Sequence, residues 1–386
     1  MPLTDSDAQA KQLRDTEFAA VADLAYLDHA SDSPAPERTR RVIVERAELL
    51  ANPLAQVRNR EDYLADANRF LGELLNTTPD RFAYLTNAAD ATAAIANGIG
   101  WQPGDNVVLV QGEYPSFVLP WTRLARYGVD ARFATPNGIE TDLEAIDAVI
   151  DDQTRAVVIS HVDFNSGYRN DLATIGLLAH AHGALFVVDA SQSLGAIPVD
   201  VTAWGIDALV CVGYKWLMGP HGISVLYISE SAQDQIVPTS PGRYSVRSGW
   251  PFPNYDLDWA DSAIRYQGGA LNWIGVCALA ESIGLHAEVG SDVIARRVIE
   301  LTDLLIDKLD TLPVEITSSR DLQHRSSYLT FTLGSIERDD TLVDAGKAAN
   351  VLFGRRGGGV RVGTHFWNDE TDLDRLTALV EQSAKA

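Results

Sequence analysis

Short apolar segments alternate with segments of helical periodicity between about residue 80 and residue 230, and this alternation restricts the fold more than any other feature. The apolar segments have the length of strands and are rich in β-branched residues. They read RFAYLT, DNVVLVQ, RAVVISHV, ALFVVDAS, ALVCVGY and ISVLYIS. Continuous apolar strands are typical of sheets buried on both faces, so the pattern predicts an α/β fold with a mainly parallel sheet between helices. Ligands of such sheets bind at the carboxyl ends of the strands.

The pattern changes after about residue 275, where a long amphipathic stretch has helical periodicity over residues 275–312. Two β-like segments, SYLTFTL and GGVRVGTHF, and a C-terminal helical segment follow it. We therefore expect a large α/β domain over residues 71–275 and a smaller α+β domain over residues 276–386. The N-terminal segment, residues 1–70, is expected to pack with the smaller domain.

Charge and hydropathy exclude several classes of protein. The 386 residues carry a net charge of −22 and lack the basic cluster that a nucleic-acid-binding protein needs. The apolar runs are far shorter than the roughly 20 residues that cross a bilayer. The N-terminus also lacks the apolar region of a secretory signal. These features predict a cytoplasmic protein that binds neither nucleic acid nor membranes.

The chain has two cysteines, Cys211 and Cys277, which is too few for a disulfide scaffold or a cysteine-rich zinc site. We therefore expect no metal site. Cys211 lies within the apolar run ALVCVG, where we interpret it as a buried and unreactive thiol.

Asp189 and Lys215 are the residues whose positions most clearly suggest chemistry. Asp189 ends one apolar strand, and Lys215 follows the next strand 26 residues later. A parallel sheet brings both residues to one edge, where an acid and a lysine suit pyridoxal phosphate. The lysine would form the Schiff base, and the acid would keep the pyridine nitrogen protonated. A simple ion pair at the sheet edge is the alternative.

The segment LTNAADATAA is expected to bind a phosphate group. It has the pattern of a strand, a tight turn and a helix start, so the backbone N–H groups of Asn87, Ala88 and Ala89 are available to an anion. Thr86 and Asn87 add side-chain donors, although Asn87 can also be an ordinary helix cap. Tyr114, at the end of the strand DNVVLV, can stack on a flat cofactor or belong to the core. The missing GxGxxG pattern argues against a dinucleotide-dependent oxidoreductase.

Residues 187–229, from VVDASQSLGA to GISVLYIS, resemble the class V aminotransferase family, which includes cysteine desulfurases, kynureninase and isopenicillin N epimerase. The resemblance extends from YLDHASDSPAP to GVRVGTHFWNDETDLDRL, which is nearly the whole chain. It implies a fold type I enzyme with pyridoxal 5'-phosphate as cofactor and a seven-stranded, mainly parallel sheet. It also implies a homodimer with a shared active site that acts on a small amino-acid substrate.

The same resemblance assigns roles around the cofactor ring. Lys215 would be the Schiff-base lysine and the proton shuttle, and Asp189 would pair with the pyridine nitrogen. Gln192, in the DxxQ pattern, would donate to the phenolic oxygen of the ring. Tyr114 would occupy the stacking position.

Further roles concern the phosphate. The resemblance places Asn87 and Ala88 in the phosphate turn, and Tyr214 matches the YK pattern of kynureninases, whose tyrosine contacts phosphate. In the family, a threonine of the partner chain reaches the phosphate from a GTPN-like turn. Ala270 stands in its place in QGGALNW, and Asn272 is expected to substitute for it.

Substrate binding is assigned to Arg361, which matches the arginine that binds the substrate α-carboxylate in the family. The planar guanidinium suits this task because it forms two parallel hydrogen bonds with a carboxylate. The alternative is a surface arginine at a strand edge. Asp163 and Asn165 are also expected near the ring.

The segment GKAANVLFGRRGGGVR, residues 346–361, lacks the nucleophilic cysteine of cysteine desulfurases, so persulfide formation on the protein is not expected. Arg355 and Arg356 in this segment either bind an acidic substrate or form a solvated turn. We expect chemistry at Cα through an external aldimine, in the form of carbon–sulfur β-lyase activity on a cysteine-type substrate. Transamination, decarboxylation-coupled deamination and epimerisation are alternatives. A cofactor-binding sensor without turnover is another, although the short acidic N-terminus leaves no room for a DNA-binding extension.

Overall fold

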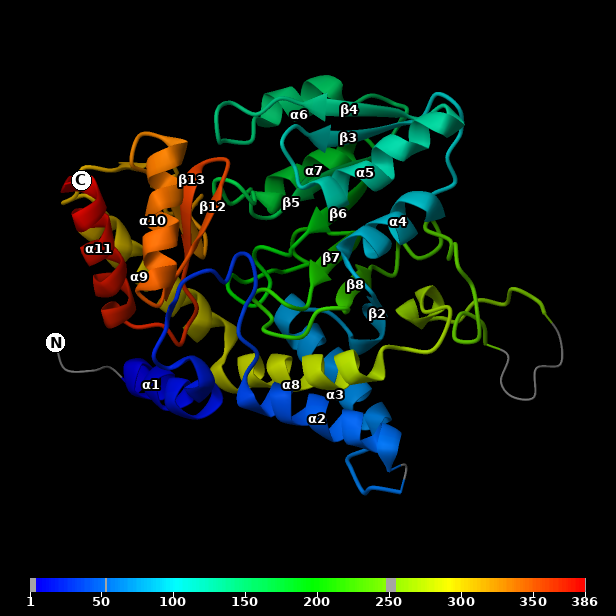
Figure 1. Ribbon diagram of the computed structural model, residues 1–386. Coiled ribbons are helices and arrows are strands. Elements are labelled where there is room, and N and C mark those ends of the chain that lie inside the picture. The colour runs from blue at the N-terminus through cyan, green and yellow to red at the C-terminus, as the bar shows by residue number, and fades with distance from the viewer. Residues whose placement is uncertain (1–4, 53, 248–254, 386) are drawn as a thin grey trace.

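A seven-stranded sheet forms the centre of the molecule (Figure 1), in a computed structural model that describes residues 5–52, 54–247 and 255–385. The strand order is β2–β8–β7–β6–β5–β3–β4. Parallel pairing runs from β7 to β4, whereas β8 is antiparallel to both β7 and β2. The expected mainly parallel α/β sheet is therefore confirmed. The strands are β2 (Phe82–Leu85), β3 (Asn106–Val110), β4 (Asp130–Ala134), β5 (Thr154–Ser160), β6 (Leu185–Asp189), β7 (Ala208–Val212) and β8 (Ser224–Ile228).

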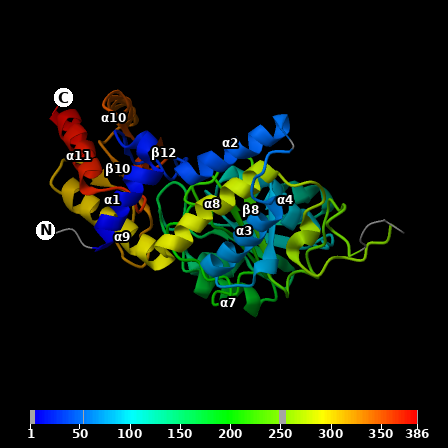
Figure 2. The same ribbon diagram turned by 90° about the horizontal axis from the view of Figure 1, so that it is seen from below.

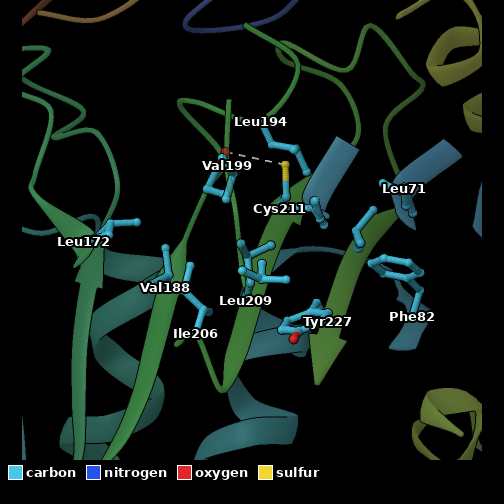
Figure 3. Packing of buried hydrophobic residues seen from close by; sticks show 14 of the residues in the cluster. Leu71, Phe82, Leu172, Val188, Leu194, Val199, Ile206, Leu209, Cys211 and Tyr227 are labelled. Carbon is cyan, nitrogen blue, oxygen red and sulfur yellow. Dashed lines mark hydrogen bonds between the residues drawn. The ribbon is translucent and has the colours of Figure 1, made fainter. Parts of the chain in front are cut away.

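Helices cover both faces of this sheet. Successive residues of a strand point to opposite faces, and apolar side chains are buried on each of them. One apolar cluster joins the sheet to α3 (Arg60–Leu75), α6 (Leu143–Val149), α7 (Leu172–Ala181) and α8 (Trp273–Val289). The other cluster joins it to α4 (Ala88–Gly98) and α5 (Pro115–Thr122). Figure 3 shows the first cluster around Leu209 and Cys211 of β7. The sheet is thus buried on both sides, and ligands reach it at its edge.

The C-terminal part of the chain forms a second sheet, in the order β12–β13–β10–β9. The helical stretch expected over residues 275–312 is confirmed, but it forms two helices because Gly290 has a φ of +92°. A separate apolar cluster fills the space between this sheet and its helices. The elements are α9 (Ser291–Leu309), β9 (Glu315–Ile316), β10 (Tyr328–Thr332), α10 (Ile336–Ala348), β11 (Val351–Leu352), β12 (Gly354–Arg356), β13 (Gly359–Gly363) and α11 (Glu370–Lys385).

The N-terminal segment contacts both parts of the molecule. Arg14 of α1 (Asp5–Glu17) forms an ion pair of 2.9 Å with Asp372 of α11. The short strand β1 (Ala25–Tyr26) pairs with β11. In contrast, α2 (Glu37–Ala51) and α3 lie along α8 (Figures 1 and 2). The division into segments at residues 70 and 275 stays a prediction, and residues 1–4 of the first segment lie outside the described residues.

One strand of the central sheet, β4, was not predicted from the sequence. It lies at the edge of the sheet, and only Ala134 of its five residues is buried. An exposed edge strand lacks the continuous apolar pattern that marks buried strands. Among the described helices, none combines the length and the apolar content needed to cross a bilayer.

Candidate active site

The carboxyl ends of β5, β6 and β7 lie side by side and carry the residues of the site. Ser160 of β5 is in register with Asp189 of β6, which in turn pairs with Val210 of β7. Lys215 is the third residue after β7. A cavity of about 150 Å³ opens at this edge. Its lining consists of Asn87, Ala88, Ala89, Tyr114, Ser116, Ser160, Val162, Phe164, Asp189, Ser191, Gln192, Val212, Tyr214 and Lys215.

Asp189 and Lys215 face this cavity as the strand pattern predicts. Burial raises the pKa of Asp189, while the N–H and hydroxyl of Ser191 and the charge of Lys215 act in the opposite direction. The Ser191 N–H donates to Asp189 Oδ1 at 2.7 Å. Lys215 acts on Asp189 through its charge, and among the described residues no ion pair joins the two side chains directly. The alternative of a direct ion pair therefore does not describe this arrangement.

Lys215 lies in an environment that favours its neutral amine. Its pKa is lowered to about 8, mainly by burial; Asp189 opposes this shift, and the positive charges of Arg361 and Arg356 add to it. Its Nζ atom lies 5.8 Å from the centre of the Tyr114 ring. An amine with a lowered pKa is a better nucleophile and base near neutral pH than an exposed lysine.

Tyr114 is 46% exposed and lies at the mouth of the cavity. Its ring is perpendicular to that of Phe164, with centres 5.1 Å apart. A core position, which was the alternative for Tyr114, is excluded by this exposure. Phe164 was not singled out from the sequence, which pointed instead to its neighbours Asp163 and Asn165. The Asp163 carboxylate accepts from the N–H groups of Asn165 and Ser166 and so closes the turn that presents Phe164.

Gln192 is buried and held in one orientation. Its Oε1 accepts from Trp216 Nε1 at 3.0 Å, and its Nε2 donates to the Ala30 carbonyl at 3.0 Å. A primary amide has two N–H bonds, so one remains for an acceptor in the cavity. Tyr214, the residue before Lys215, stacks on His221 with ring centres 4.1 Å apart.

The turn before α4 and the first residues of this helix line the cavity through Asn87, Ala88 and Ala89. Asn87 Oδ1 accepts from the Asp90 N–H at 2.9 Å, so Asn87 is a helix cap, which was one of the two interpretations of this residue. The first N–H groups of a helix have no partner within it and attract anions. The cap and the expected phosphate turn are therefore compatible.

Thr86 and Asn272 do not line the cavity of Lys215. Both line a second cavity of about 560 Å³, beyond the end of β2. Asn272 caps α8 by accepting from the Gly275 N–H at 3.0 Å, and it donates to the Gly222 carbonyl at 3.0 Å. Within one chain, Thr86 and Asn272 therefore do not line the cavity that the other predicted cofactor residues share.

Arg361 is 1% exposed and contacts the cavity lining through the backbone of Phe164. Its Nη1 donates to the Phe164 carbonyl at 3.0 Å, and its Nη2 donates to Ser31 Oγ at 2.7 Å. Its Nε and the Oδ1 atom of Asp28, 3.8 Å from Nη2, are buried without a hydrogen-bond partner within the described part of the chain. A surface position is therefore excluded, and polar atoms remain available to a ligand.

Glu113 is a further residue of the site that the sequence analysis missed. Burial raises its pKa to about 7, although hydrogen bonds from Ser160 oppose the shift. The Ser160 N–H donates to Glu113 Oε1 at 2.6 Å, and the Ser160 hydroxyl donates to Oε2. These bonds tie the end of β3 to the end of β5, next to Tyr114. A carboxylate three positions after the end of a buried strand was the available signal.

Both cysteines lie outside the cavity. Cys211 is 1% exposed, and Figure 3 shows it among apolar side chains on the face of the sheet that α3 and α8 cover. Burial raises its pKa well above the usual range. Cys277 is buried within α8. The expectation that Cys211 is a buried thiol is confirmed, and neither thiol can reach a substrate in the cavity of Lys215.

The cavity residues match the chemical groups of pyridoxal phosphate. A buried carboxylate suits a protonated ring nitrogen, a free amide N–H suits the phenolic oxygen, and an amine of lowered pKa suits the aldehyde. The helix start of α4 suits the phosphate. Asp189, Gln192, Lys215 and the turn before Ala88 supply these groups.

Comparisons with known proteins agree with this geometry. The family model Aminotransferase class-V matches residues 25–376. A probable cysteine desulfurase of Methanothermobacter thermautotrophicus is 28% identical over 386 residues and covers 94% of this chain and 96% of its own length. The solved structure of the cystine C–S lyase C-DES with its product cysteine persulfide has a TM-score of 0.86 at 22% identity, over 95% of this chain and 99% of that one. A cysteine desulfurase from Thermococcus onnurineus NA1 has a TM-score of 0.85 at 22% identity, over 97% and 98%.

Proposed function

Because the chain belongs to the class-V aminotransferase family, and is thus an enzyme that depends on pyridoxal phosphate, we propose that it is a carbon–sulfur β-lyase acting on a cysteine-type substrate. The observation that carries this proposal is the cavity of Lys215, which holds an activated amine and no thiol. Similarity to cysteine desulfurases and to a cystine C–S lyase supports sulfur-containing substrates. The positions of both cysteines argue against transfer of sulfur to the protein.

Lys215, Asp189 and Arg361 have different roles in the proposed reaction. When bound, pyridoxal phosphate withdraws electrons from the substrate Cα and so acidifies the proton on that carbon. Lys215 holds the cofactor and then removes the Cα proton, because its pKa of about 8 suits proton transfer near neutral pH. Asp189 keeps the ring nitrogen protonated, and Arg361 binds the α-carboxylate.

The proposed reaction balances without an oxidant or an acceptor. The Cα–H and Cβ–S bonds break, the sulfur leaves as a thiolate, and the thiolate takes up a proton. Water then hydrolyses the remaining three-carbon fragment to pyruvate and ammonium. Each substrate molecule thus consumes one water molecule and gives one thiol, one pyruvate and one ammonium ion.

The test is pyruvate release from cysteine, cystine and S-alkyl cysteines by the cofactor-loaded enzyme, measured by coupling to lactate dehydrogenase without any keto acid. We expect one pyruvate for each sulfur product, which is sulfide from cysteine, cysteine persulfide from cystine and a thiol from S-alkyl cysteines. Lys215→Ala is expected to release neither. Product formation that requires an added keto acid would instead assign the protein to the transaminases. A persulfide on Cys211 or Cys277, detected by mass spectrometry after turnover, would contradict the absence of sulfur transfer.

We also propose that the active protein is a homodimer. Thr86 and Asn272 line a cavity of about 560 Å³ that adjoins the phosphate turn but is open to solvent in the single chain. A partner chain that covers this cavity would bring its own residues to the phosphate. Light scattering of the loaded enzyme should give twice the chain mass of 42.0 kDa, and a mass of one chain would refute the dimer.

A further inference from the structure

The hairpin formed by β12 and β13 presents two arginines on the same face. Gly354 pairs with Arg361, and Arg356 pairs with Gly359. Cross-strand partners share a face, and side chains alternate along each strand. Arg356 and Arg361 therefore lie diagonally on one face, and the other two positions of that face are glycines, which leave it open.

Arg355 points to the opposite face of the same hairpin. Its Nε forms an ion pair with the Asp340 carboxylate of α10. The two adjacent arginines, which the sequence could not distinguish, thus differ in their surroundings. Arg355 is part of the contact between the hairpin and α10, whereas Arg356 is exposed and lies on the face that contains Arg361.

The guanidinium groups of Arg356 and Arg361 converge on a single hydroxyl. Ser31 Oγ accepts from Arg356 Nη2 at 2.9 Å and from Arg361 Nη2 at 2.7 Å. Within the described residues, Arg361 forms one long ion pair, 3.8 Å to Asp28, and Arg356 forms none. Two like charges that share one neutral acceptor repel each other, and an anion bound at either guanidinium reduces this repulsion.

This arginine pair is close to the substrate cavity. Arg361 donates to the carbonyl of Phe164, and Phe164 lines the cavity of Lys215. Burial is the main cause of the lowered pKa of Lys215, and the positive charges of Arg361 and Arg356 also lower it. Both guanidinium groups are therefore close enough to influence the charge of Lys215 in the cavity. Arg356 is the exposed member of the pair, whereas Arg361 is buried.

We propose that Arg356 is a specificity-determining residue that binds a second anionic group, at the distal end of the substrate. Arg361 still binds the α-carboxylate. The proposed substrates are therefore cysteine S-conjugates that carry a carboxylate on the sulfur substituent. This inference rests on the proposed function for the reaction. The binding of two anionic groups by the arginine pair can be measured without turnover.

Turnover and binding are measured separately, with wild type, Arg356→Ala and Arg355→Ala. S-carboxymethyl-cysteine and S-methyl-cysteine differ in the distal carboxylate, and kcat/KM is determined for both. Adipate and hexanoate have matching chain lengths and lack the amino group needed for reaction. Their dissociation constants are measured by calorimetry with the cofactor-loaded enzyme. Arg355→Ala removes the same charge from the same hairpin and is the matched control.

We expect Arg356→Ala to lower kcat/KM for S-carboxymethyl-cysteine, and to weaken adipate binding, on the order of tenfold, since one charged hydrogen bond is lost. S-methyl-cysteine and hexanoate should change by less than about twofold, and Arg355→Ala should resemble wild type. Equal losses for both substrates would assign Arg356 to the α-carboxylate and overturn the proposal. So would adipate binding in wild type that is no tighter than hexanoate binding. Selective adipate binding without any pyruvate release would refute the proposed lyase but leave the arginine site intact.

Discussion

The amine of Lys215 lies 5.8 Å from the centre of the Tyr114 ring, and both side chains line the same cavity. Lys215 comes from the end of β7 and Tyr114 from the end of β3, with β6 and β5 between them in the sheet. The two residues are 101 positions apart in the sequence. Their proximity results from the parallel sheet, which collects strand ends at one edge.

Replacement of Lys215 by alanine is expected to abolish covalent attachment of the cofactor, because no other amine lines the cavity within the described residues. Borohydride treatment of the loaded wild type should add the mass of the reduced cofactor to the peptide that contains Lys215. Lys347→Ala, which removes an exposed lysine paired with Asp344, is the control and should retain the added mass. A label that persists in Lys215→Ala would place the attachment elsewhere.

The capture of pyridoxal phosphate by the cofactor-free protein is expected to accelerate with pH. Burial lowers the pKa of Lys215 from 10.5 to about 8, so the fraction of neutral amine rises roughly tenfold between about pH 7 and pH 9 and then levels off. Stopped-flow absorbance measures the rate. Nα-acetyl-lysine, with an unshifted amine, should continue to accelerate above pH 9, and identical profiles for protein and control would contradict the lowered pKa.

Glu113 is expected to make stability depend on pH. Burial raises its pKa from 4.5 to about 7, so between these values the folded protein keeps a proton that the unfolded chain has lost. The free energy of unfolding therefore falls as the pH rises through this window, by up to about 3 kcal/mol. Glu113→Gln should remove this loss.

Urea denaturation at pH 5 and pH 8 checks the effect of Glu113 as a difference between wild type and variant. The exposed residue Glu48 offers the control Glu48→Gln, which should follow the wild-type dependence. Parallel stability curves for wild type and Glu113→Gln would show that Glu113 does not carry the pH dependence.

Gly195 is expected to tolerate no side chain, because it packs against the backbone of the loop that contains Lys215. Its φ is +101°, and a Cβ atom there would collide with the carbonyl of Trp216, the residue after Lys215. Gly195→Ala should lower the free energy of unfolding by more than about 3 kcal/mol. Gly183 also has a positive φ of +71° but open space around it. Gly183→Ala should cost about 1 kcal/mol, and equal losses in thermal unfolding would refute the steric argument.

Strand ends and buried strands were accessible from the sequence because they depend on local patterns. The apolar runs that end at Asp189 and shortly before Lys215 predicted a parallel sheet with both residues at one edge. The strand β4 was missed because four of its five residues are at least partly exposed, so pattern alone does not identify it. The antiparallel orientation of β8 was also not predicted, since the composition of a buried strand does not depend on its direction in the sheet.

Local sequence by itself therefore determined the α/β class, the buried Cys211 and the positions of Asp189, Lys215 and Tyr114 at strand ends, since periodicity and strand ends are properties of neighbouring residues. Gln192 and Tyr214 were assigned through the family resemblance. Only the tertiary structure decided that Arg361 donates to the Phe164 carbonyl, that Glu113 is bonded to Ser160, and that Arg356 and Arg355 lie on opposite faces of their hairpin. These relationships join segments far apart in the chain or depend on strand register. Burial, charge and hydrogen bonding at such contacts are set by the three-dimensional neighbours, and the order of residues along the chain does not specify them.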